Sequence, residues 1–214
     1  MIINNTISTA AARRFYNRWA SWQIWVDHSE SRARNRALDL LAPVSGQRIL
    51  NAGVGTGQTQ AHLQAVVAPT GTVVGLDLSP VMLHHTCVRI HTPLCEADVR
   101  HLPFVSASFD GVFSSFVLDL LPFDDLAELL QDFQRVLKPD GRIVLVSLTE
   151  GINASSRLFM ALWKLVYRVS PIACGGCRPL QLAALVSQAG FCQIVREVVV
   201  QLGMPSEIVA ATRC

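Results

Sequence analysis

Charged residues are scarce in this sequence, and so is any imbalance between their signs. Only 16% of the 214 residues are charged, 50% are hydrophobic, and the formal net charge is +2. A charge this small and scattered argues against the basic face typical of nucleic-acid binding, so we expect no nucleic-acid partner. Charges or turn residues interrupt every apolar run before it reaches the length of a bilayer span. We therefore expect no transmembrane helix.

The sequence also lacks a secretory signal pattern. Asn4, Asn5 and Thr6 follow the first three residues directly, and the arginines come only later, so we expect no cleaved leader and a cytoplasmic location. The six cysteines are spread along the chain, which predicts free thiols in a reducing compartment. Cys174 and Cys177 have the spacing of a zinc-ligand pair, but no second Cys or His pair is suitably placed. We expect no metal site there.

Short apolar runs alternate with helix-length segments through the middle of the chain. Strands are predicted at 48–51, 72–77, 92–96, 109–114 and 142–147, with helices between them at 58–67, 80–88 and 124–137. This alternation indicates an open α/β fold, a parallel sheet covered by helices on both faces. The flanking predictions are helices at 15–26 and 31–41, then a helix at 154–169, a loop at 171–179, a helix at 180–189, a strand at 193–200 and an apolar segment at 208–211.

Three glycines, Gly53, Gly55 and Gly57, lie directly after the first of these strands and before a helix. Glycine lets the backbone approach a ligand closely, and the amides at the start of the helix then face that ligand. A dinucleotide fingerprint would need its third glycine where Gln58 stands, and a phosphate loop would need a Lys-Ser or Lys-Thr pair that is absent. The spacing argues against a pyrophosphate ligand, and a plain strand-to-helix turn is the structural alternative.

Asp77 ends the second predicted strand, about twenty residues after the glycines. A carboxylate at this position can accept hydrogen bonds from both hydroxyls of a ribose. The alternative role, a helix N-cap, is better filled by Ser79, which precedes Pro80 at the first helical position. The glycines and Asp77 together favour a nucleoside ligand, and by themselves they leave adenosylmethionine and a nicotinamide both open.

Two further segments resemble motifs of a known family. Residues 96–104 read EADVRHLPF and precede SFDGVFSS at 108–115, and residues 133–142 read FQRVLKPDGR. They are similar to the adenine-contact acid, the fourth strand and the RVLKPGG turn of class I S-adenosylmethionine-dependent methyltransferases. The chain most resembles the ubiquinone/menaquinone C-methyltransferase type and its small-molecule relatives, over residues 13–150. The resemblance implies a Rossmann-like sheet of seven mostly parallel strands, the last one antiparallel, and S-adenosylmethionine as cofactor.

The resemblance also implies which residues contact the cofactor. They are Tyr16, Asn51, Gly53, Gly55, Gly57, Asp77, Leu78, Met82, Asp98, Val99, Ser114 and Ser115. By the family's pattern the glycines approach the methionyl part, Asp77 holds the ribose and Asp98 with Val99 reads the adenine edge. Leu78 and Met82 would pack near the adenosine, and Ser114 or Ser115 would lie beside the sulfonium.

Tyr16 and Asn51 differ from the other positions in how they match the family. Tyr16 lies in a segment similar to the family's YDxxA entry helix, whose tyrosine closes over the cofactor. Asn51 departs from the family, which usually has an acid there to position the charged methionyl end. An amide keeps the hydrogen bonds of that acid and loses its charge.

We interpret the chain as one domain in four parts. These are an N-terminal helical cap (1–45), a cofactor-binding core (46–150), a substrate-side insertion (151–180) and a C-terminal helix and strands (181–214). The expected function is methyl transfer to a small lipophilic acceptor, such as a quinone-like ring, a lipid amine or a natural-product intermediate. The alternatives are a non-catalytic binding protein with the same fold and, less favoured by the glycine spacing, a nicotinamide-dependent oxidoreductase.

Some methyl acceptors must lose a proton, and three residues are candidates for the base: Tyr16, His28 and Asp119. His28 has the alternative of a solvated turn residue, and Asp119 the alternative of orienting a loop.

The helix at 154–169 is the expected wall of the acceptor pocket, with Phe159, Trp163 and Tyr167 as contacts. Arg157, Lys164 and Arg168 fall close to one of its faces. This cationic row either lies in water or rests on an anionic membrane surface, so segment 154–171 is a candidate for peripheral membrane contact.

Overall fold

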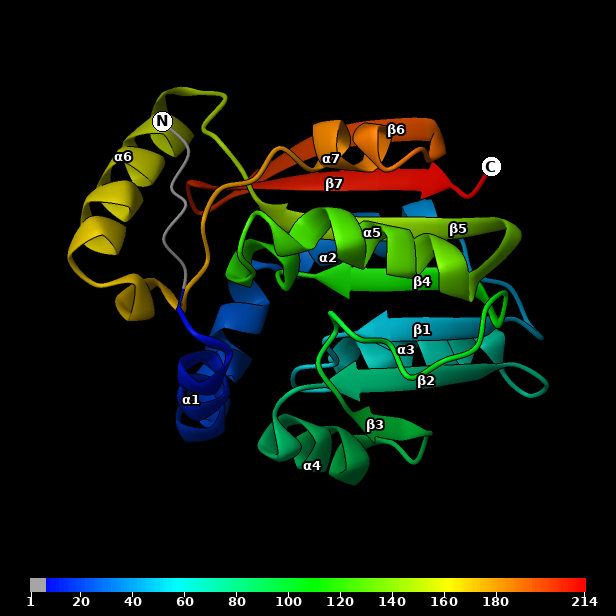
Figure 1. Cartoon of the computed structure of the whole chain (residues 1–214). Coiled ribbons are helices and arrows are strands. Elements are labelled where there is room, and N and C mark those ends of the chain that lie inside the picture. Colours follow the sequence, from blue (N-terminus) through cyan, green and yellow to red (C-terminus); the bar gives the residue numbers. More distant parts are fainter. Residues whose placement is uncertain (1–6) are drawn as a thin grey trace.

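A computed structural model describes residues 7–214, without the side chains of residues 20–27. One seven-stranded sheet organises these residues, with helices on both of its faces (Figure 1). The strands are β1 (Arg48–Ala52), β2 (Thr72–Asp77), β3 (Leu94–Glu96), β4 (Phe109–Ser115), β5 (Leu137–Leu148), β6 (Cys192–Gln201) and β7 (Met204–Thr212). The helices are α1 (Thr9–Ser29), α2 (Ser31–Leu41), α3 (Gln58–Val67), α4 (Pro80–Arg89), α5 (Asp125–Val136), α6 (Ala154–Val169) and α7 (Leu182–Gln188), with short 3-10 turns η1 (Leu118–Leu120) and η2 (Pro171–Cys174).

The order of the strands places a ligand-binding position at the middle of the sheet. The order is β3-β2-β1-β4-β5-β7-β6, and all neighbours from β3 to β5 are parallel. β7 runs antiparallel to both β5 and β6. The expected seven-stranded Rossmann-like sheet with an antiparallel last strand is thus confirmed. The chain reverses its direction of winding between β1 and β4, and open α/β sheets bind ligands at the carboxyl ends of the strands at such a point.

Two apolar cores, one on each face, hold the helices to the sheet. On one face α5 and α7 contribute to the core, and on the other α2 and α3 do so. In α5 the buried residues recur with the helical period, Leu126, Leu129, Leu130 and Phe133, so one stripe of the helix faces the strands. The strands between are buried on both faces, which explains their near-continuous apolar sequences.

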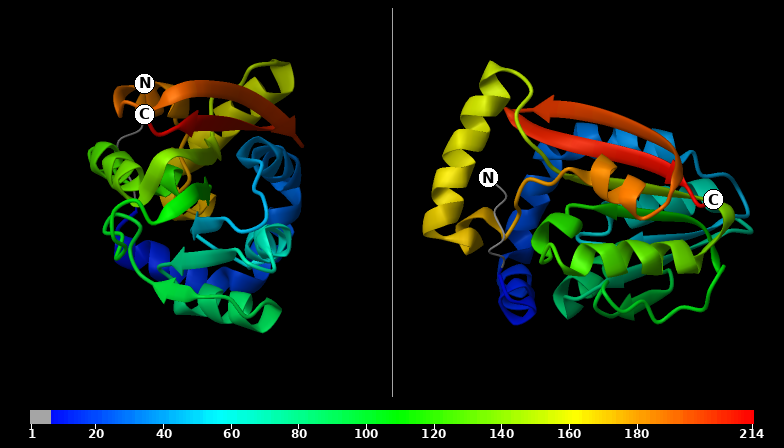
Figure 2. Two further views of the ribbon diagram at one scale, coloured as in Figure 1. Left: turned by 90° about the vertical axis from the view of Figure 1, so that its right-hand side faces the viewer. Right: turned by 45° about the horizontal axis from the view of Figure 1, so that its top comes forward.

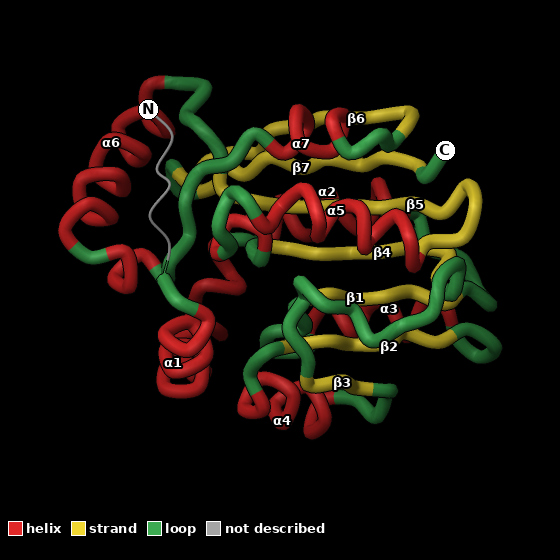
Figure 3. The backbone as a smooth tube through the Cα atoms, viewed as in Figure 1, coloured by secondary structure: helices red, strands yellow, loops and turns green. Residues whose placement is uncertain are grey.

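Helices α1 and α6 lie beyond the end of the sheet to which the parallel strands point (Figures 1 and 2). In Figure 3, where strands are yellow and helices red, α1 and α6 lie to the left of the strands. In Figure 1, α1 lies beyond the carboxyl ends of β1 and β2, and α6 lies level with β5 and β7. No helix among residues 7–214 combines the length and the apolar character needed to cross a bilayer.

Several element boundaries differ from those predicted. Helix α1 begins at Thr9 rather than at residue 15, and β5 begins at Leu137, because the segment read as a turn continues as extended chain. The expectation of six free thiols is wrong for one pair, since Cys192 and Cys214 form a disulfide. Cys192 pairs with Thr212 across the β6–β7 ladder, which brings the two cysteines together at one end of the hairpin. Cys87, Cys95, Cys174 and Cys177 are free.

Candidate functional site

A cavity of about 720 Å³ opens at the carboxyl ends of β1, β2 and β4. Its volume lies within the range of small-molecule sites, about 300–1,000 Å³. One wall consists of the turns that follow the strands, including Gly53–Thr56, Asp77–Ser79, Ala97–Arg100 and Ser115–Val117. The opposite wall comes from α1, η1, α6, η2 and the turn between β6 and β7. We call these the strand wall and the helix wall.

The glycine turn belongs to the strand wall, and its three glycines have different surroundings. All three have positive φ angles, +87° at Gly53, +53° at Gly55 and +81° at Gly57. A Cβ atom at Gly53 would overlap the side chain of Val117, whereas one at Gly55 would have no atom within 4 Å. Gly53 and Gly55 line the cavity, as expected of residues that let a ligand approach the backbone.

Gly57 does not appear in the lining of the cavity. It is the N-cap of α3, and a Cβ atom there would lie 2.9 Å from the Cα of Thr86 in α4. Its lack of a side chain therefore permits close packing of α3 against α4. The structure thus gives Gly57 a packing role, and its contact with the cofactor stays a prediction.

Asp77 lies at the end of β2 and faces the turn after β1. Its Oδ2 accepts a hydrogen bond from the Gly55 amide at 3.0 Å, and its Oδ1 accepts one from the Ser79 amide at 2.9 Å. Burial raises the pKa of Asp77 to about 6, against the lowering effect of these amides. Each carboxylate oxygen has a second lone pair, so Asp77 can accept further hydrogen bonds from a diol in the cavity it lines.

Ser79 caps α4 as the sequence predicts. Its Oγ accepts a hydrogen bond from the Met82 amide at 3.2 Å, and Pro80 follows at the first position of the helix. The same hydroxyl donates to the Oδ1 of Asn17 in α1 at 2.6 Å. The cap thereby also joins the N-terminal helix to the strand wall. Leu78 and Met82 line the cavity beside it.

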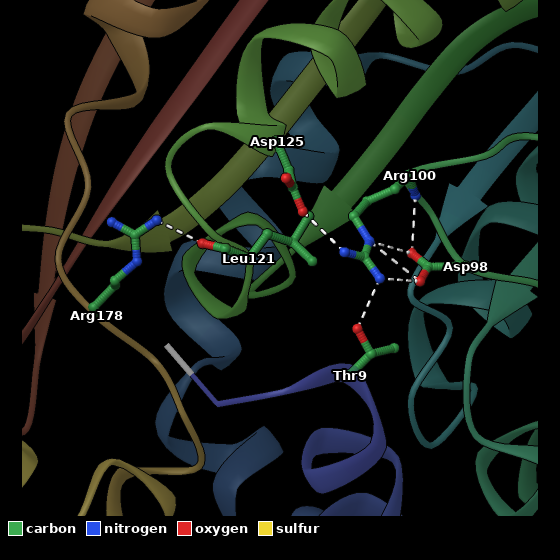
Figure 4. A network of polar contacts seen from close by, with 6 residues as sticks. All are labelled: Thr9, Asp98, Arg100, Leu121, Asp125 and Arg178. Carbon is green, nitrogen blue, oxygen red and sulfur yellow. Dashed lines mark hydrogen bonds and ion pairs between the residues drawn. The ribbon is translucent and has the colours of Figure 1, made fainter. Parts of the chain in front are cut away.

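Asp98 lies in a network that sequence reasoning missed (Figure 4). The guanidinium of Arg100 donates to Asp98 at 2.6 Å, to Asp125 at 2.9 Å and to the hydroxyl of Thr9 at 2.7 Å. Partial burial acts to raise the pKa of Asp98, but the hydrogen bonds from Arg100 outweigh it and lower that pKa. Asp98, Val99 and Arg100 all line the cavity. Asp98 is therefore held as a carboxylate, the form that can accept a hydrogen bond from an amino group of a base.

Two expected cofactor contacts face the protein interior instead. The amide nitrogen of Asn51 donates to the Oε1 of Gln60 at 3.0 Å, and the residue is buried outside the cavity lining. The Oγ of Ser114 donates to the carbonyl of Ala52 at 2.8 Å and is buried as well. Ser115, the next residue along the strand, does line the cavity. Alternation of side chains along β4 explains this difference.

Two aromatic side chains of α6 form part of the helix wall. Phe159 and Trp163 of α6 stack with their ring centroids 5.6 Å apart, and the indole nitrogen of Trp163 donates to the Cys177 carbonyl at 2.9 Å. Both residues line the cavity, and their contact with an acceptor stays a prediction. Tyr167 is instead buried behind this wall, where its hydroxyl donates to the Gly176 carbonyl at 3.3 Å.

Tyr16 is the one of the three candidate bases that lines the cavity. Its ring meets Phe15 edge to face at 5.3 Å, and its hydroxyl donates to the Gly175 carbonyl at 3.3 Å. Burial, with the nearby Cys177 and Asp119, raises the pKa of Tyr16 well above its ordinary value. The phenol therefore remains protonated at neutral pH and serves as a hydrogen-bond donor.

The other two candidate bases lie outside the cavity. His28 is exposed near the end of α1, where its carbonyl accepts hydrogen bonds from Ser31 and Gln201. Asp119 is buried in η1, and its Oδ2 accepts from the Leu148 amide at 3.2 Å. Burial raises the pKa of Asp119 to about 7. Neither His28 nor Asp119 is among the residues that line the cavity.

Polar residues from the start of α2 also line the cavity and were missed by sequence reasoning. Glu30 and Arg34 project beside the glycine turn, and Arg34 donates to the Oε1 of Gln58 at 3.2 Å. Their position depends on how α2 packs against the sheet, so no local pattern marks them. The hydrogen bond of Arg34 joins α2 to Gln58, the residue that directly follows Gly57.

Comparisons with known proteins agree with this architecture. Residues 50–145 match the model of a methyltransferase domain family, Methyltransf_11. An uncharacterised methyltransferase of Bacillus subtilis (strain 168), YodH, is 42% identical over 50% of this chain and 46% of its own length. A demethylmenaquinone methyltransferase of Lactobacillus johnsonii is 30% identical over 64% of this chain and 57% of its own. The chain spans about half the length of these curated relatives.

A solved structure shows the same fold over nearly the whole chain. It is the N-methyltransferase NodS of Bradyrhizobium japonicum WM9 in complex with S-adenosyl-L-homocysteine, with a TM-score of 0.71 and 15% identity, covering 95% of this chain and 98% of NodS. The chain has the fold of this solved methyltransferase, and in sequence it is similar to S-adenosylmethionine-dependent methyltransferases of class I. Its residues 50–145 match the methyltransferase domain family named above. The resemblance read from the sequence motifs is thus confirmed.

Proposed function

We propose that this chain transfers a methyl group from S-adenosylmethionine to a small, lipophilic acceptor. The observation that carries the proposal is the contrast between the two walls of one cavity. The strand wall presents two carboxylates, Asp77 and Asp98, held by backbone amides and by Arg100. The helix wall presents Phe159, Trp163 and Leu120. A nucleoside suits the first wall and a flat or aliphatic acceptor suits the second.

The residues of the strand wall fit the expected cofactor. Asp77 would accept the ribose hydroxyls, and Asp98 with Val99 would contact the adenine edge. Gly53 and Gly55 expose backbone to the methionyl part, and Gly55 also leaves open space there. When bound, the cofactor supplies an activated methyl group on a sulfonium. The chain itself contributes alignment and exclusion of water, the two requirements of an in-line transfer between apposed walls.

The residues of the helix wall position the acceptor. Phe159 and Trp163 offer a stacked aromatic surface, and the Trp163 indole is fixed by its bond to Cys177. Tyr16 lies on the same wall with a phenol that stays protonated. Its proton is donated to Gly175, so its oxygen can accept a hydrogen bond from a hydroxyl or amine of the methyl acceptor. An amine acceptor needs no base, whereas a carbon or phenol acceptor must lose a proton. The lining favours quinone-like rings, lipid amines and natural-product intermediates as candidate acceptors.

Isothermal titration with S-adenosylmethionine and with NAD tests the cofactor. We expect binding of S-adenosylmethionine alone, weakened by about 2 kcal/mol, or about thirtyfold, in Asp77→Ala, because its backbone and ribose partners lose a buried acceptor. Asp39→Ala, an exposed carboxylate on α2 outside the cavity, is the matched control. Unchanged affinity in Asp77→Ala would remove the site assignment, and preference for NAD would favour the oxidoreductase alternative.

A search for transferred label tests catalysis. Incubation with tritiated S-adenosylmethionine and extracts of cell lipids and small molecules should label an apolar product. Binding of the cofactor without any labelled product would favour a non-catalytic binding protein, the alternative that the neutral Asn51 also suggests.

A cytoplasmic location and peripheral membrane contact through residues 154–171 complete the proposal. The four free cysteines support a reducing compartment, and the Cys192–Cys214 disulfide weighs against it. Fractionation of cells into soluble, membrane and exported protein tests the location.

A further inference from the structure

Helix α6 presents a row of aliphatic side chains to solvent. Leu158, Leu162, Leu165 and Val169 are 64%, 57%, 59% and 84% exposed. They recur at helical spacing, so they form one continuous stripe along the helix. A capping box at Asn153 fixes the start of the helix, and its opposite face is buried through Ser156, Met160 and Tyr167. The stripe is therefore held outward on a well-anchored helix, which lies at the rim of the molecule in Figures 1 and 2.

A row of cations lies next to this aliphatic stripe. Arg157, Lys164 and Arg168 share a neighbouring face of α6, and the helix contains no acidic residue. Lys164 pairs with Glu150. Arg157 and Arg168 are exposed, and within the described part of the chain neither forms an ion pair or a hydrogen bond through its side chain. An aliphatic face bordered by such cations is complementary to an apolar surface that carries negative charge.

The aliphatic stripe is also continuous with the mouth of the cavity. Phe159 and Trp163, on the side of the stripe away from the cations, line the cavity. Leu202, in the turn between β6 and β7, lines it as well and is 80% exposed. The adjacent Gly203 lies against the ring of Phe159. One apolar surface thus runs from the outside of α6 over the rim and into the cavity.

We propose that α6 docks this protein on the surface of an anionic lipid bilayer, with the cavity mouth facing the acyl chains. The aliphatic stripe would enter the interface, and Arg157 and Arg168 would contact lipid phosphates. The helix is too short and too charged to cross the bilayer and lies along it. The docking itself needs no catalysis, while entry of an acceptor from the bilayer rests on the function proposed above.

A lipid surface fits this stripe better than a protein partner does. Protein interfaces depend on aromatic anchors, above all Trp and Tyr. In α6 the aromatic residues Phe159, Trp163 and Tyr167 point toward the body of the protein, and the outward row is purely aliphatic. Aliphatic side chains flanked by arginine are the composition of helices that lie in membrane interfaces.

Co-sedimentation of the full chain with phosphatidylcholine vesicles, with and without phosphatidylglycerol, tests the proposal. We expect retention by the anionic vesicles at low ionic strength, and weaker retention by neutral vesicles or at high salt. Arg157→Gln and Arg168→Gln should each lower the partition coefficient about fivefold. Leu162→Gln should lower it about tenfold or more, since an exposed leucine is buried on docking. Val88→Gln on α4 and Arg142→Gln on β5 are the matched controls, both exposed and both outside α6.

Two results would overturn the proposal. One is equal retention of Leu162→Gln and Val88→Gln by anionic vesicles, or no retention of the unmodified chain at low salt. The other is a dimer in size-exclusion chromatography that Leu162→Gln dissociates, which would assign the stripe to a second copy of the chain. Titration of the same variants with S-adenosylmethionine keeps this test separate from the proposed function, because the α6 substitutions lie outside the strand wall.

Discussion

The strand wall and the helix wall of the cavity are built in different ways. The residues of the strand wall lie within a few positions of the ends of β1, β2, β3 and β4, between Gly53 and Val117. The helix wall gathers α1, η1, α6, η2 and the β6–β7 turn, which span the chain from Ile7 to Met204. The first wall is made by local turns on a rigid sheet. The second depends on long-range packing of segments that have no ligand motif of their own.

This difference explains why the two walls also differ chemically. Backbone amides and carboxylates at strand ends give fixed hydrogen-bonding directions, as the contacts of Asp77 with Gly55 and Ser79 show. Packed helices offer apolar area and tolerate exchange of side chains with little change of backbone. A chain of this fold can therefore keep one cofactor site while its acceptor site changes.

The largest effect is expected in the glycine turn of the strand wall. Gly57→Ala should lower the free energy of unfolding by about 2–4 kcal/mol, because the new Cβ meets the Thr86 backbone and the residue has a left-handed φ. Gly55→Ala should cost about 1 kcal/mol, since only the φ angle opposes it. Urea unfolding of both variants measures the difference. Equal losses would show that α3 and α4 pack less closely than described.

The next effect concerns Asn51. The family pattern predicts that Asn51→Asp keeps or tightens cofactor binding. The hydrogen bond between Asn51 and Gln60 predicts instead that the free energy of unfolding falls by about 2–3 kcal/mol, because a buried carboxylate would face the Oε1 of Gln60. The Gln60 amide cannot flip to donate to the new carboxylate without losing the hydrogen bonds that its nitrogen donates to the Val73 carbonyl and to Thr92.

Chemical unfolding of Asn51→Asp, with the exposed Asn35→Asp as control, decides between these expectations. An Asn51→Asp protein as stable as the control, with tighter cofactor binding, would restore the family role to this position. A destabilised protein would mean that the neutral amide is part of the core.

The fold and the strand wall could be predicted largely from the sequence because their signals are local. The alternation of strands and helices, the cap at Ser79 and the acid at Asp77 each depend on a few neighbouring residues. Tertiary context decided what such signals could not. The inward turn of Asn51 depends on Gln60 in α3, and the Arg100 network needs Thr9 and Asp125 from distant segments.

The helix wall was predictable only in part. The helix at 154–169 and its residues Phe159 and Trp163 were found from their periodicity and position in the chain. Helical spacing alone could not show that Tyr167 lies behind the wall or that the aliphatic row stays exposed, because both depend on what the helix packs against.

A smaller effect is expected on the helix wall. With an acceptor identified by label transfer, Trp163→Ala should raise its KM about tenfold through loss of apolar contact area. Affinity for S-adenosylmethionine should remain unchanged, because Trp163 belongs to the opposite wall. Tyr167→Phe is the matched control, as its hydroxyl lies outside the cavity. A parallel loss of cofactor affinity in Trp163→Ala would show that the two walls are not independent.

The smallest effect is a pH dependence of cofactor affinity set by Asp77. Burial favours the neutral carboxyl and raises its pKa to about 6. As the pH falls through this value Asp77 takes up a proton and loses an acceptor site that the ribose hydroxyls require. From pH 7.5 to pH 5.5 the affinity for S-adenosylmethionine should fall about fourfold, since roughly three quarters of the free protein then carries the proton.

Titration calorimetry across this range, with two control variants, assigns the effect. Asp77→Asn should bind more weakly and show a flat profile, because it cannot ionise. Asp119→Asn should keep the pH dependence of the unmodified chain, since Asp119 lies behind the helix wall. Asp119 is the informative control because burial raises its pKa to about 7. No histidine is among the described residues that line the cavity, so a histidine in contact with the ligand is not the source. If the pH dependence persists in Asp77→Asn and vanishes in Asp119→Asn, then Asp119 and not Asp77 is the group whose protonation controls the cofactor affinity.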